Sequence, residues 1–134
     1  MTTAHVHLRV GAERYALPVA DVHSIVDMEG LAPVLGMPSS VLGLRALDGA
    51  LLPIFDLATL FGVAGASPTR IVVVDGAAPL GLAVDEVLDV AELPPLEPAD
   101  AGARLRGTAL LDGTLVGAID LPAVIGELEG AMAA

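Results

Sequence analysis

The stretch that decides the fold reads GLRALDGALLPIFDLATLFG over residues 43–62. It returns without a gap as GTALLDGTLVGAIDLPAVIG over residues 107–126, at an offset of 64 positions. Identical residues stand at eight of the 20 positions, namely Gly43, Leu47, Asp48, Gly49, Leu51, Asp56, Leu57 and Gly62, which recur as Gly107, Leu111, Asp112, Gly113, Leu115, Asp120, Leu121 and Gly126. A fainter echo at an offset of 65 matches Leu17, Val19 and Val22 with Leu82, Val84 and Val87. The chain is therefore expected to form a single domain, residues 1–134, made of two pseudo-repeated halves of about 5–62 and 70–126.

The repeated residues suit structural tasks. Asp48-Gly49 and its copy Asp112-Gly113 each stand between apolar stretches, where Asp-Gly favours a tight turn between two strands. Asp56 and Asp120 can each cap a short helix. Gly62 is expected to end the first helix, and the second is expected to run from Asp120 through about Leu128. Each unit is thus predicted to be a hairpin followed by a helix, and the two units are expected to occupy corresponding places in the fold.

Composition predicts an aliphatic core with some apolar surface. Hydrophobic residues make up 54% of the chain and aromatic residues only 2%, so the core must consist of Val, Leu, Ile and Ala. A small core needs a smaller number of apolar residues than this, so some of them are predicted to form an exposed apolar contact patch. Acidic residues interrupt every apolar segment well before the roughly 18 to 20 residues that span a bilayer. No direct membrane insertion is therefore expected.

Charge and cysteine content narrow the partners and the compartment. Seventeen acidic residues against six arginines give a formal charge of -11, which excludes nucleic acid as an expected partner and favours basic partners. Cysteine is absent, which rules out disulfides and thiolate metal sites and is compatible with a reducing compartment. No secretory signal is visible at the N-terminus, so a cytoplasmic location is expected.

Period-two alternation dominates the chain and predicts an all-β fold. Val6, Leu8 and Val10 alternate with polar residues, and the pattern resumes after residues 11–14, which indicates a hairpin with one buried face. Residues 21–27 fit one helical turn followed by a strand, and the unbroken apolar run 71–74 predicts a strand covered on both faces. Two small barrels of about five strands each, with short connecting helices, satisfy this layout because closing a short sheet removes its edges.

Three segments resemble the signatures of the CheW-like domain family. Residues 43–49 (GLRALDG) and 52–57 (LPIFDL) are similar to the family pattern G-V-x-N-L-R-G … V-P-V-I-D-L. Residues 81–87 (GLAVDEV) resemble its G-l-x-V-D-x-V segment, and residues 105–121 resemble its closing segment. The resemblance covers residues 5–126 in order and implies two barrels of the Src-homology type. A free-standing copy is similar to the adaptor of the family, which couples chemoreceptors to a CheA-type histidine kinase without a cofactor.

The resemblance also implies two contact surfaces. The groove for the cytoplasmic tip of a chemoreceptor is expected to comprise Val22, Ile25, Leu47, Asp48, Arg70, Gly81 and Val87. The surface for the regulatory domain of the kinase is expected to include some of Leu8, Leu17 and Val19. Burial of such aliphatic side chains in an interface contributes about 1.5 to 3 kcal/mol each before the costs of association.

The chain departs from the family pattern in the receptor-facing region. Ala46 stands where the family has Asn, Asp48 where it has Arg, and Ser24 where a Glu is often found. A carboxylate only accepts hydrogen bonds, whereas a guanidinium donates several, so the preferred partner group at residue 48 is expected to change from acidic to basic. The alternative is a divergent connector that has lost either the kinase or the receptor contact and serves a non-motility array.

At each candidate catalytic or metal-binding residue, a structural role is favoured over a chemical one. Asp48 and Asp112 could form a catalytic dyad, but each fits its hairpin turn better. His5 and His7 share one side of a strand, yet without a third ligand nearby a solvated face is preferred to a metal site. Neither a nucleophile motif nor a phosphate-binding loop is present, so no enzyme activity is expected. A small-molecule binding barrel remains open as a more distant class, and it requires an internal cavity.

Overall fold

The computed structural model describes residues 3–99 and 104–133. In this part of the chain ten strands, a 3-10 turn and two helices follow one another. Their bounds are β1 Ala4–Val10, β2 Glu13–Pro18, η1 Val19–Asp21, β3 Val22–Asp27, β4 Val41–Leu47, β5 Ala50–Asp56, α1 Leu57–Phe61, β6 Arg70–Asp75, β7 Pro79–Val84, β8 Glu86–Glu92, β9 Leu105–Leu111, β10 Thr114–Ile119 and α2 Leu121–Ala133. The expected all-β class and the helical turn before β3 are confirmed.

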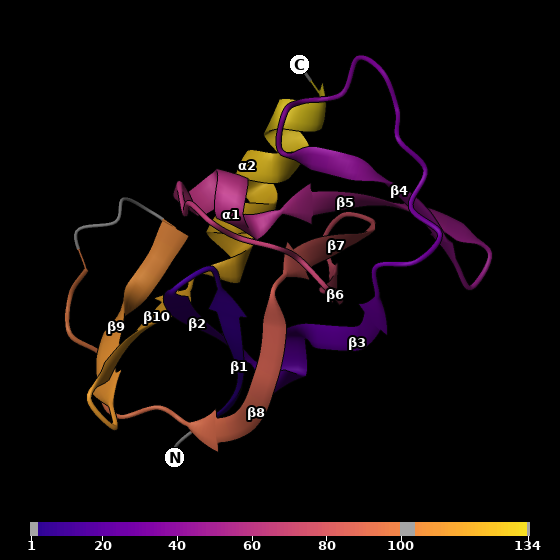
Figure 1. The fold of residues 1–134 in the computed structure, drawn as a ribbon. Coiled ribbons are helices and arrows are strands. Elements are labelled where there is room, and N and C mark those ends of the chain that lie inside the picture. The colour runs from indigo at the N-terminus through magenta and orange to yellow at the C-terminus, as the bar shows by residue number, and fades with distance from the viewer. Residues whose placement is uncertain (1–2, 100–103, 134) are drawn as a thin grey trace.

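The strands form two five-stranded sheets that do not coincide with the two halves of the sequence (Figure 1). The sheet that we name sheet A has the order β8-β1-β2-β10-β9, and the one that we name sheet B has the order β3-β6-β7-β5-β4. The first hairpin of each half therefore pairs with the last three strands of the other half. Strands β1 and β2 join β8–β10 from the second half, whereas β6 and β7 join β3–β5 from the first.

The two sheets have equivalent strand pairings. β1 and β2 pair antiparallel, as do β6 and β7, and each sheet contains one parallel pair, β2 with β10 or β7 with β5. Sheet A continues to β9 and sheet B to β4 through antiparallel hairpins. The repeated hairpins β4–β5 and β9–β10 thus occupy corresponding places in the two sheets, as the sequence repeat predicts, and each is followed by a helix.

The turns and helix starts follow from local chemistry. Asp48 and Asp112 both have φ of 49°, and the glycines after them have φ of 80° and 79°, as a two-residue hairpin turn with left-handed central residues requires. The Asp56 carboxylate accepts a hydrogen bond from the N–H of Ala58 at 3.3 Å, and the Asp120 carboxylate accepts one from Ala123 at 3.2 Å. Gly62 ends α1 in a left-handed conformation with φ of 69°, as expected, whereas α2 continues past its expected end near Leu128 to Ala133.

Gly43 and Gly107 share one reason for lacking a side chain. Ala32 forms two backbone hydrogen bonds of 2.8 Å with Leu44, and Glu97 forms the same two with Thr108. A Cβ on Gly43 would lie 2.6 Å from the Ala32 carbonyl oxygen, and one on Gly107 would lie 2.6 Å from that of Glu97. In each sheet a loop residue therefore pairs with the edge strand next to the repeated glycine, where a side chain would have no room.

The main core lies between the sheets and includes residues from both. Leu8 and Leu17 of sheet A are 0% exposed, as are Val72 and Leu82 of sheet B. Helix α2 adds Leu121, Val124, Ile125 and Leu128 to the same cluster, and Figure 1 shows this helix (yellow) running beside both sheets. A second, smaller cluster of Leu52, Ile54, Ile71, Val73 and Ala83 lies on the other face of sheet B. In each sheet we name the face that is turned away from the main core the inner face. β6 is therefore covered on both faces, as its unbroken apolar run predicts.

Candidate functional site

The acidic residues considered as a dyad stand apart in the fold. Asp48 lies in the β4–β5 turn of sheet B and Asp112 in the β9–β10 turn of sheet A, and both are exposed. In residues 3–99 and 104–133, no group of three or more His, Cys, Asp or Glu side chains is arranged to hold a metal ion. Neither helix of the described chain has the length and apolar character needed to cross a membrane.

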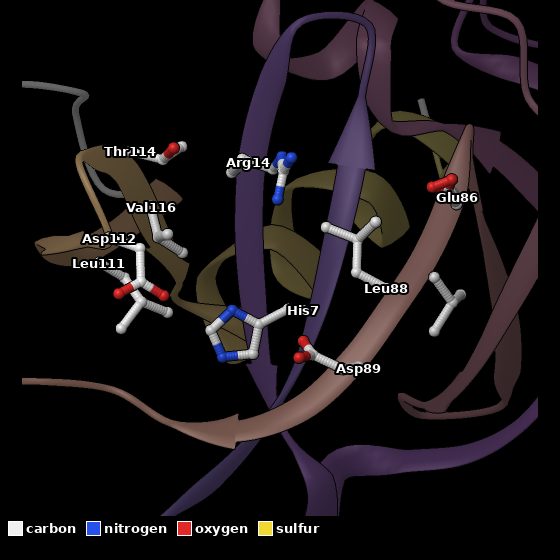
Figure 2. Close-up of a pocket in the computed structure, with 10 residues that line it drawn as sticks. His7, Arg14, Glu86, Leu88, Asp89, Leu111, Asp112, Thr114 and Val116 are labelled. Atoms are coloured by element: carbon white, nitrogen blue, oxygen red, sulfur yellow. The ribbon is translucent and has the colours of Figure 1, made fainter.

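A cleft of about 520 Å³ lies in sheet A (Figure 2). Strand β8 forms one wall with Glu86 and Asp89, and the β9–β10 hairpin forms the other with Asp112. Arg14 and His7, on the paired strands β2 and β1, lie between these walls. Figure 2 shows the His7 ring in the middle of the cleft, between Asp89 and Asp112. Charged groups of both signs therefore face one space.

The expected solvated face at His5 and His7 is wrong, because both residues are only 5% exposed. The ring of His7 makes a 3.2 Å hydrogen bond through Nε2 to the carbonyl oxygen of Ala91, and the ring of His5 makes one of 2.8 Å through Nδ1 to Thr3. The two side chains share one side of β1, as their spacing predicts, but that side is the inner face of sheet A. Alternation alone does not tell which face of a two-sided strand is covered.

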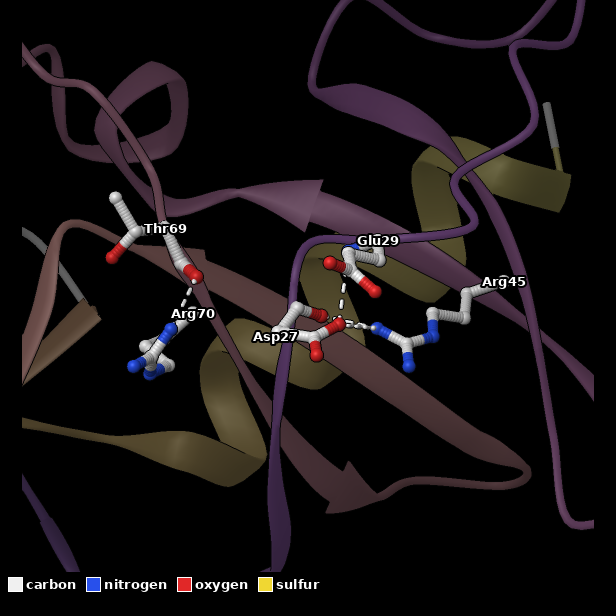
Figure 3. Close-up of polar contacts among 5 residues, drawn as sticks. All are labelled: Asp27, Glu29, Arg45, Thr69 and Arg70. Carbon is white, nitrogen blue, oxygen red and sulfur yellow. Dashed lines mark hydrogen bonds and ion pairs between the residues drawn. The ribbon is translucent and has the colours of Figure 1, made fainter.

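A polar contact joins the two edge strands of sheet B (Figure 3). Arg45 of β4 donates through Nη1 to the backbone oxygen of Asp27 in β3 and, at 3.1 Å, to its carboxylate. Arg70 of β6 lies directly opposite Asp27 in the strand pairing. The pKa of the Asp27 carboxyl is lowered, first by the N–H of Glu29, which donates to it, and then by Arg45 and Arg70. Sequence reasoning assigned no role to Asp27 or Arg45, because 18 positions separate them and neither lies in a charge pattern.

The residues predicted to face a receptor are only partly brought together. Val22 and Ile25 lie on β3, which pairs with β6 carrying the exposed Arg70. Leu47 ends β4, and Asp48 follows it in the turn to β5. These residues all belong to sheet B, whereas Val87 lies on β8 of sheet A. Val22 and Val87 both pack at the margin of the core between the sheets.

Gly81 does not belong to an exposed groove. The residue is buried on β7, and a Cβ at this position would lie within 2.6 Å of the side chains of Ile54 and Ile71. The expected place of Gly81 at the edge of the receptor groove is therefore wrong. Its lack of a side chain leaves room for Ile54 and Ile71 in the packing of sheet B.

The residues predicted to face the kinase divide in the same way. Leu8 and Leu17 are completely buried between the sheets, so their expected place on an outer surface is wrong, whereas Val19 is 39% exposed. Three of the large apolar side chains that are exposed lie on the two repeated hairpins. Leu110 and Leu115 are cross-strand partners on β9 and β10 and are 66% and 60% exposed. Leu51, the counterpart of Leu115 on β5, is 69% exposed and faces Ala46.

Comparison with known proteins covers nearly the whole described fold. A model of the CheW-like domain matches residues 4–129, which include all ten strands. A relative from Rhizobium etli described as "Probable chemotaxis protein CheW" is 29% identical over 136 residues, covering 90% of this chain and 86% of the relative. The crystal structure of the scaffolding protein TtCheW from Thermoanaerobacter tengcongensis superposes with a TM-score of 0.81 at 26% identity, covering 90% of this chain and 86% of that one.

Proposed function

The chain belongs to the CheW-like domain family, and on that premise we propose that it is a scaffold adaptor that couples chemoreceptors to a CheA-type histidine kinase. The observation that carries the proposal is the match of one family model to residues 4–129, together with the same fold in a protein described as a scaffolding protein. The absence of a metal-binding group among the described residues is compatible with a function that depends on surfaces. The chain binds two partners and catalyses no reaction itself.

The receptor contact is proposed for the margin of sheet B. Val22, Ile25 and Leu47 supply apolar side chains there, Val87 extends the site onto sheet A, and Arg70 is exposed beside them. Asp48 stands at the tip of the neighbouring turn and offers a carboxylate that accepts hydrogen bonds. A receptor tip with Arg or Lys opposite Asp48 fits this surface better than an acidic tip.

The kinase contact is proposed for the β9–β10 hairpin. Leu110 and Leu115 form an adjacent exposed pair there, on the sheet that also contains β1 and β2. Two neighbouring leucines can bury a continuous apolar area against the regulatory domain of the kinase, which has the same family fold by resemblance. Val19 is the one residue of the predicted kinase surface that keeps substantial exposure.

Titrations with the receptor tip and with the kinase regulatory domain of the same organism test the two contacts separately. We expect Leu110→Ser and Leu115→Ser each to weaken kinase binding by about tenfold, because each removes an apolar contact of about 1.5 kcal/mol. Leu51→Ser is the matched control, since Leu51 is the equally exposed counterpart on the other sheet. Kinase binding that responds to Leu51→Ser and not to the other two variants would contradict the assignment.

The receptor arm uses Asp48→Arg. We expect this change to weaken binding to the native receptor, because a basic partner group would then face a second positive charge. Stronger binding, or no change, would show that Asp48 is a turn residue only. Failure of the wild-type chain to bind one of the two partners would favour the divergent connector, which retains a single contact. Failure to bind either partner would overturn the adaptor proposal.

A further inference from the structure

The inner faces of the two sheets are built on the same plan but filled differently. In sheet B, Ile54 faces Gly81 in the parallel strand pair, and Ala118 faces Ala16 at the equivalent place in sheet A. Val73 lies next to Gly81, and its counterpart next to Ala16 is His7. Sheet A therefore has smaller and more polar side chains where sheet B has a packed aliphatic cluster of Leu52, Ile54, Ile71, Val73 and Ala83.

The edges of the two sheets differ as well. Arg45 reaches across from β4 to Asp27 on β3 and joins the edge strands of sheet B. Its counterpart in sheet A is Ala109, which faces Val116 as Arg45 faces Leu52. An alanine cannot reach a partner strand, and the edge strands β8 and β9 flank the 520 Å³ cleft. The volume lies within the range of about 300 to 1,000 Å³ that is usual for small-molecule sites.

His7 brings an unused hydrogen-bond acceptor into this cleft. The carbonyl oxygen of Ala91 can only accept, so Nε2 of His7 carries the proton and Nδ1 is left as the acceptor of the neutral ring. No described residue donates to Nδ1, although only 5% of His7 is exposed. The atom is not sealed in the interior, in contrast to Nε2 of His5, which is buried without a partner. Figure 2 shows the second ring nitrogen of His7 on the side of Arg14, where a ligand could donate to it.

The charged groups around His7 are not neutralised by one another. Glu86, Asp89 and Asp112 line the walls and Arg14 lies between them, and none of the four forms an ion pair with a described residue. Three carboxylates and one guanidinium leave an excess of two negative charges in the cleft. A complementary ligand carries one carboxylate for Arg14, one cationic group that donates to His7 Nδ1 and a second cationic group for the acidic walls.

We propose that the cleft between β8 and the β9–β10 hairpin is a binding site for a free basic amino acid, L-arginine or L-lysine. The ligand carboxylate binds Arg14, the α-ammonium group donates to His7 Nδ1, and the side-chain cation lies against Asp89 and Asp112. A neutral or acidic amino acid of similar size lacks the second cationic group and leaves the acidic walls unpaired. The site does not overlap the leucine pair proposed for the kinase, so the two ideas can fail independently.

Isothermal titration of the full chain with matched ligands tests the proposal. L-arginine is expected to bind saturably with one site per chain, and L-citrulline, which has the same shape without the guanidinium charge, about tenfold more weakly. Agmatine, which lacks the carboxylate of arginine, is also expected to bind more weakly to the wild-type chain. Amide chemical-shift changes on adding L-arginine are expected on β8 and on the β9–β10 hairpin.

Three variants assign the contacts. Arg14→Gln is expected to remove the preference for L-arginine over agmatine, because the group that recognises the carboxylate is gone. Asp89→Asn and His7→Phe are expected to weaken L-arginine by about tenfold, with circular dichroism used to check that each variant folds. Glu29→Gln makes the same change of charge on an exposed loop away from the cleft and is the control.

Three results would overturn the assignment. One is the absence of saturable binding of L-arginine and L-lysine to the folded wild-type chain. Another is equal binding of L-arginine and L-citrulline, which would show that the acidic walls do not recognise the side-chain cation. The third is equal weakening by Glu29→Gln and Asp89→Asn, which would indicate only general attraction to an acidic protein.

Discussion

Gly81 lies directly opposite Ile54 in the parallel pairing of β7 and β5, and a Cβ on Gly81 would come within 2.5 Å of Ile54 Cδ1. The equivalent position of sheet A holds Ala16 opposite Ala118. In sheet B the large side chain of Ile54 faces a glycine, which has no side chain, whereas in sheet A two alanines face each other. The repeat has thus kept the strand pairing while redistributing the volume across it.

This relationship predicts a compensating pair of substitutions. Gly81→Ala should destabilise the fold by about 1 to 3 kcal/mol through overpacking, and Ile54→Ala by about 2 to 5 kcal/mol through the cavity that it leaves. The double variant should cost less than the sum of the two, by about 1 kcal/mol, since it recreates the Ala16–Ala118 arrangement. Urea unfolding of all four proteins measures this coupling. Strict additivity would mean that Ile54 is not what limits the space at residue 81.

The exchange of hairpins between the halves predicts that neither half folds alone. Among the described strands, β3 pairs only with β6 of the second half, and β8 pairs only with β1 of the first. Residues 1–64 and 65–134, produced as separate chains, should each lack cooperative unfolding and should regain it when mixed in equal amounts. Circular dichroism and gel filtration report the change. Val72→Asp in the second fragment is the control, because this residue is completely buried opposite Ile25 and a charge there should block reassembly. Cooperative unfolding of either half by itself would contradict the mutual dependence.

Asp27 predicts a stability difference that depends on pH. Its pKa in the folded chain is lowered from the ordinary 3.8, so the ionised carboxylate stabilises the fold above that pH, and the effect is lost as the pH falls through the lowered value. Asp27→Asn should therefore be less stable than the wild type at neutral pH, and the two should converge below pH 3.8. Denaturant midpoints over this range measure the difference. Arg45→Gln should show the same convergence, and a difference that persists in acid would assign the effect to something other than the charge of Asp27.

The contacts of Arg104 predict that substitutions of Arg104 and of Glu127 destabilise the fold by different amounts. Its guanidinium donates at 2.9 and 2.6 Å to the two carboxylate oxygens of Glu127 and, through Nη1, at 2.8 Å to the backbone oxygen of Leu60. Arg104→Gln removes both contacts, whereas Glu127→Gln leaves the one to Leu60. We expect the first variant to be the less stable by about 1 kcal/mol, since the half-exposed ion pair itself contributes little. Thermal unfolding compares them, and equal losses would mean that the bond to Leu60 adds nothing.

In the candidate sites, features that depend on neighbouring residues could be predicted from the sequence, and features that depend on distant residues could not. The exposure of Asp48 and the helix caps at Asp56 and Asp120 could be predicted, because a turn or a cap depends on residues a few positions apart. The burial of Leu8 and Leu17 could not, because alternation identifies one apolar face without telling what covers it. Arg45 and Asp27 meet only after β3 and β4 have become the two edges of one sheet.

By itself the sequence determined the all-β class, the two repeated hairpin-helix units, their Asp-Gly turns and the family of the chain. These features depend on short-range chemistry and on patterns that survive in the order of residues. Only the tertiary structure decided that each half gives its first hairpin to the other sheet, that His5 and His7 face inward, and that sheet A keeps a charged cleft where sheet B is packed. Strand pairing between distant segments determines all three, and many partners are compatible with one alternating pattern, so the choice depends on how the side chains fill the space between the sheets.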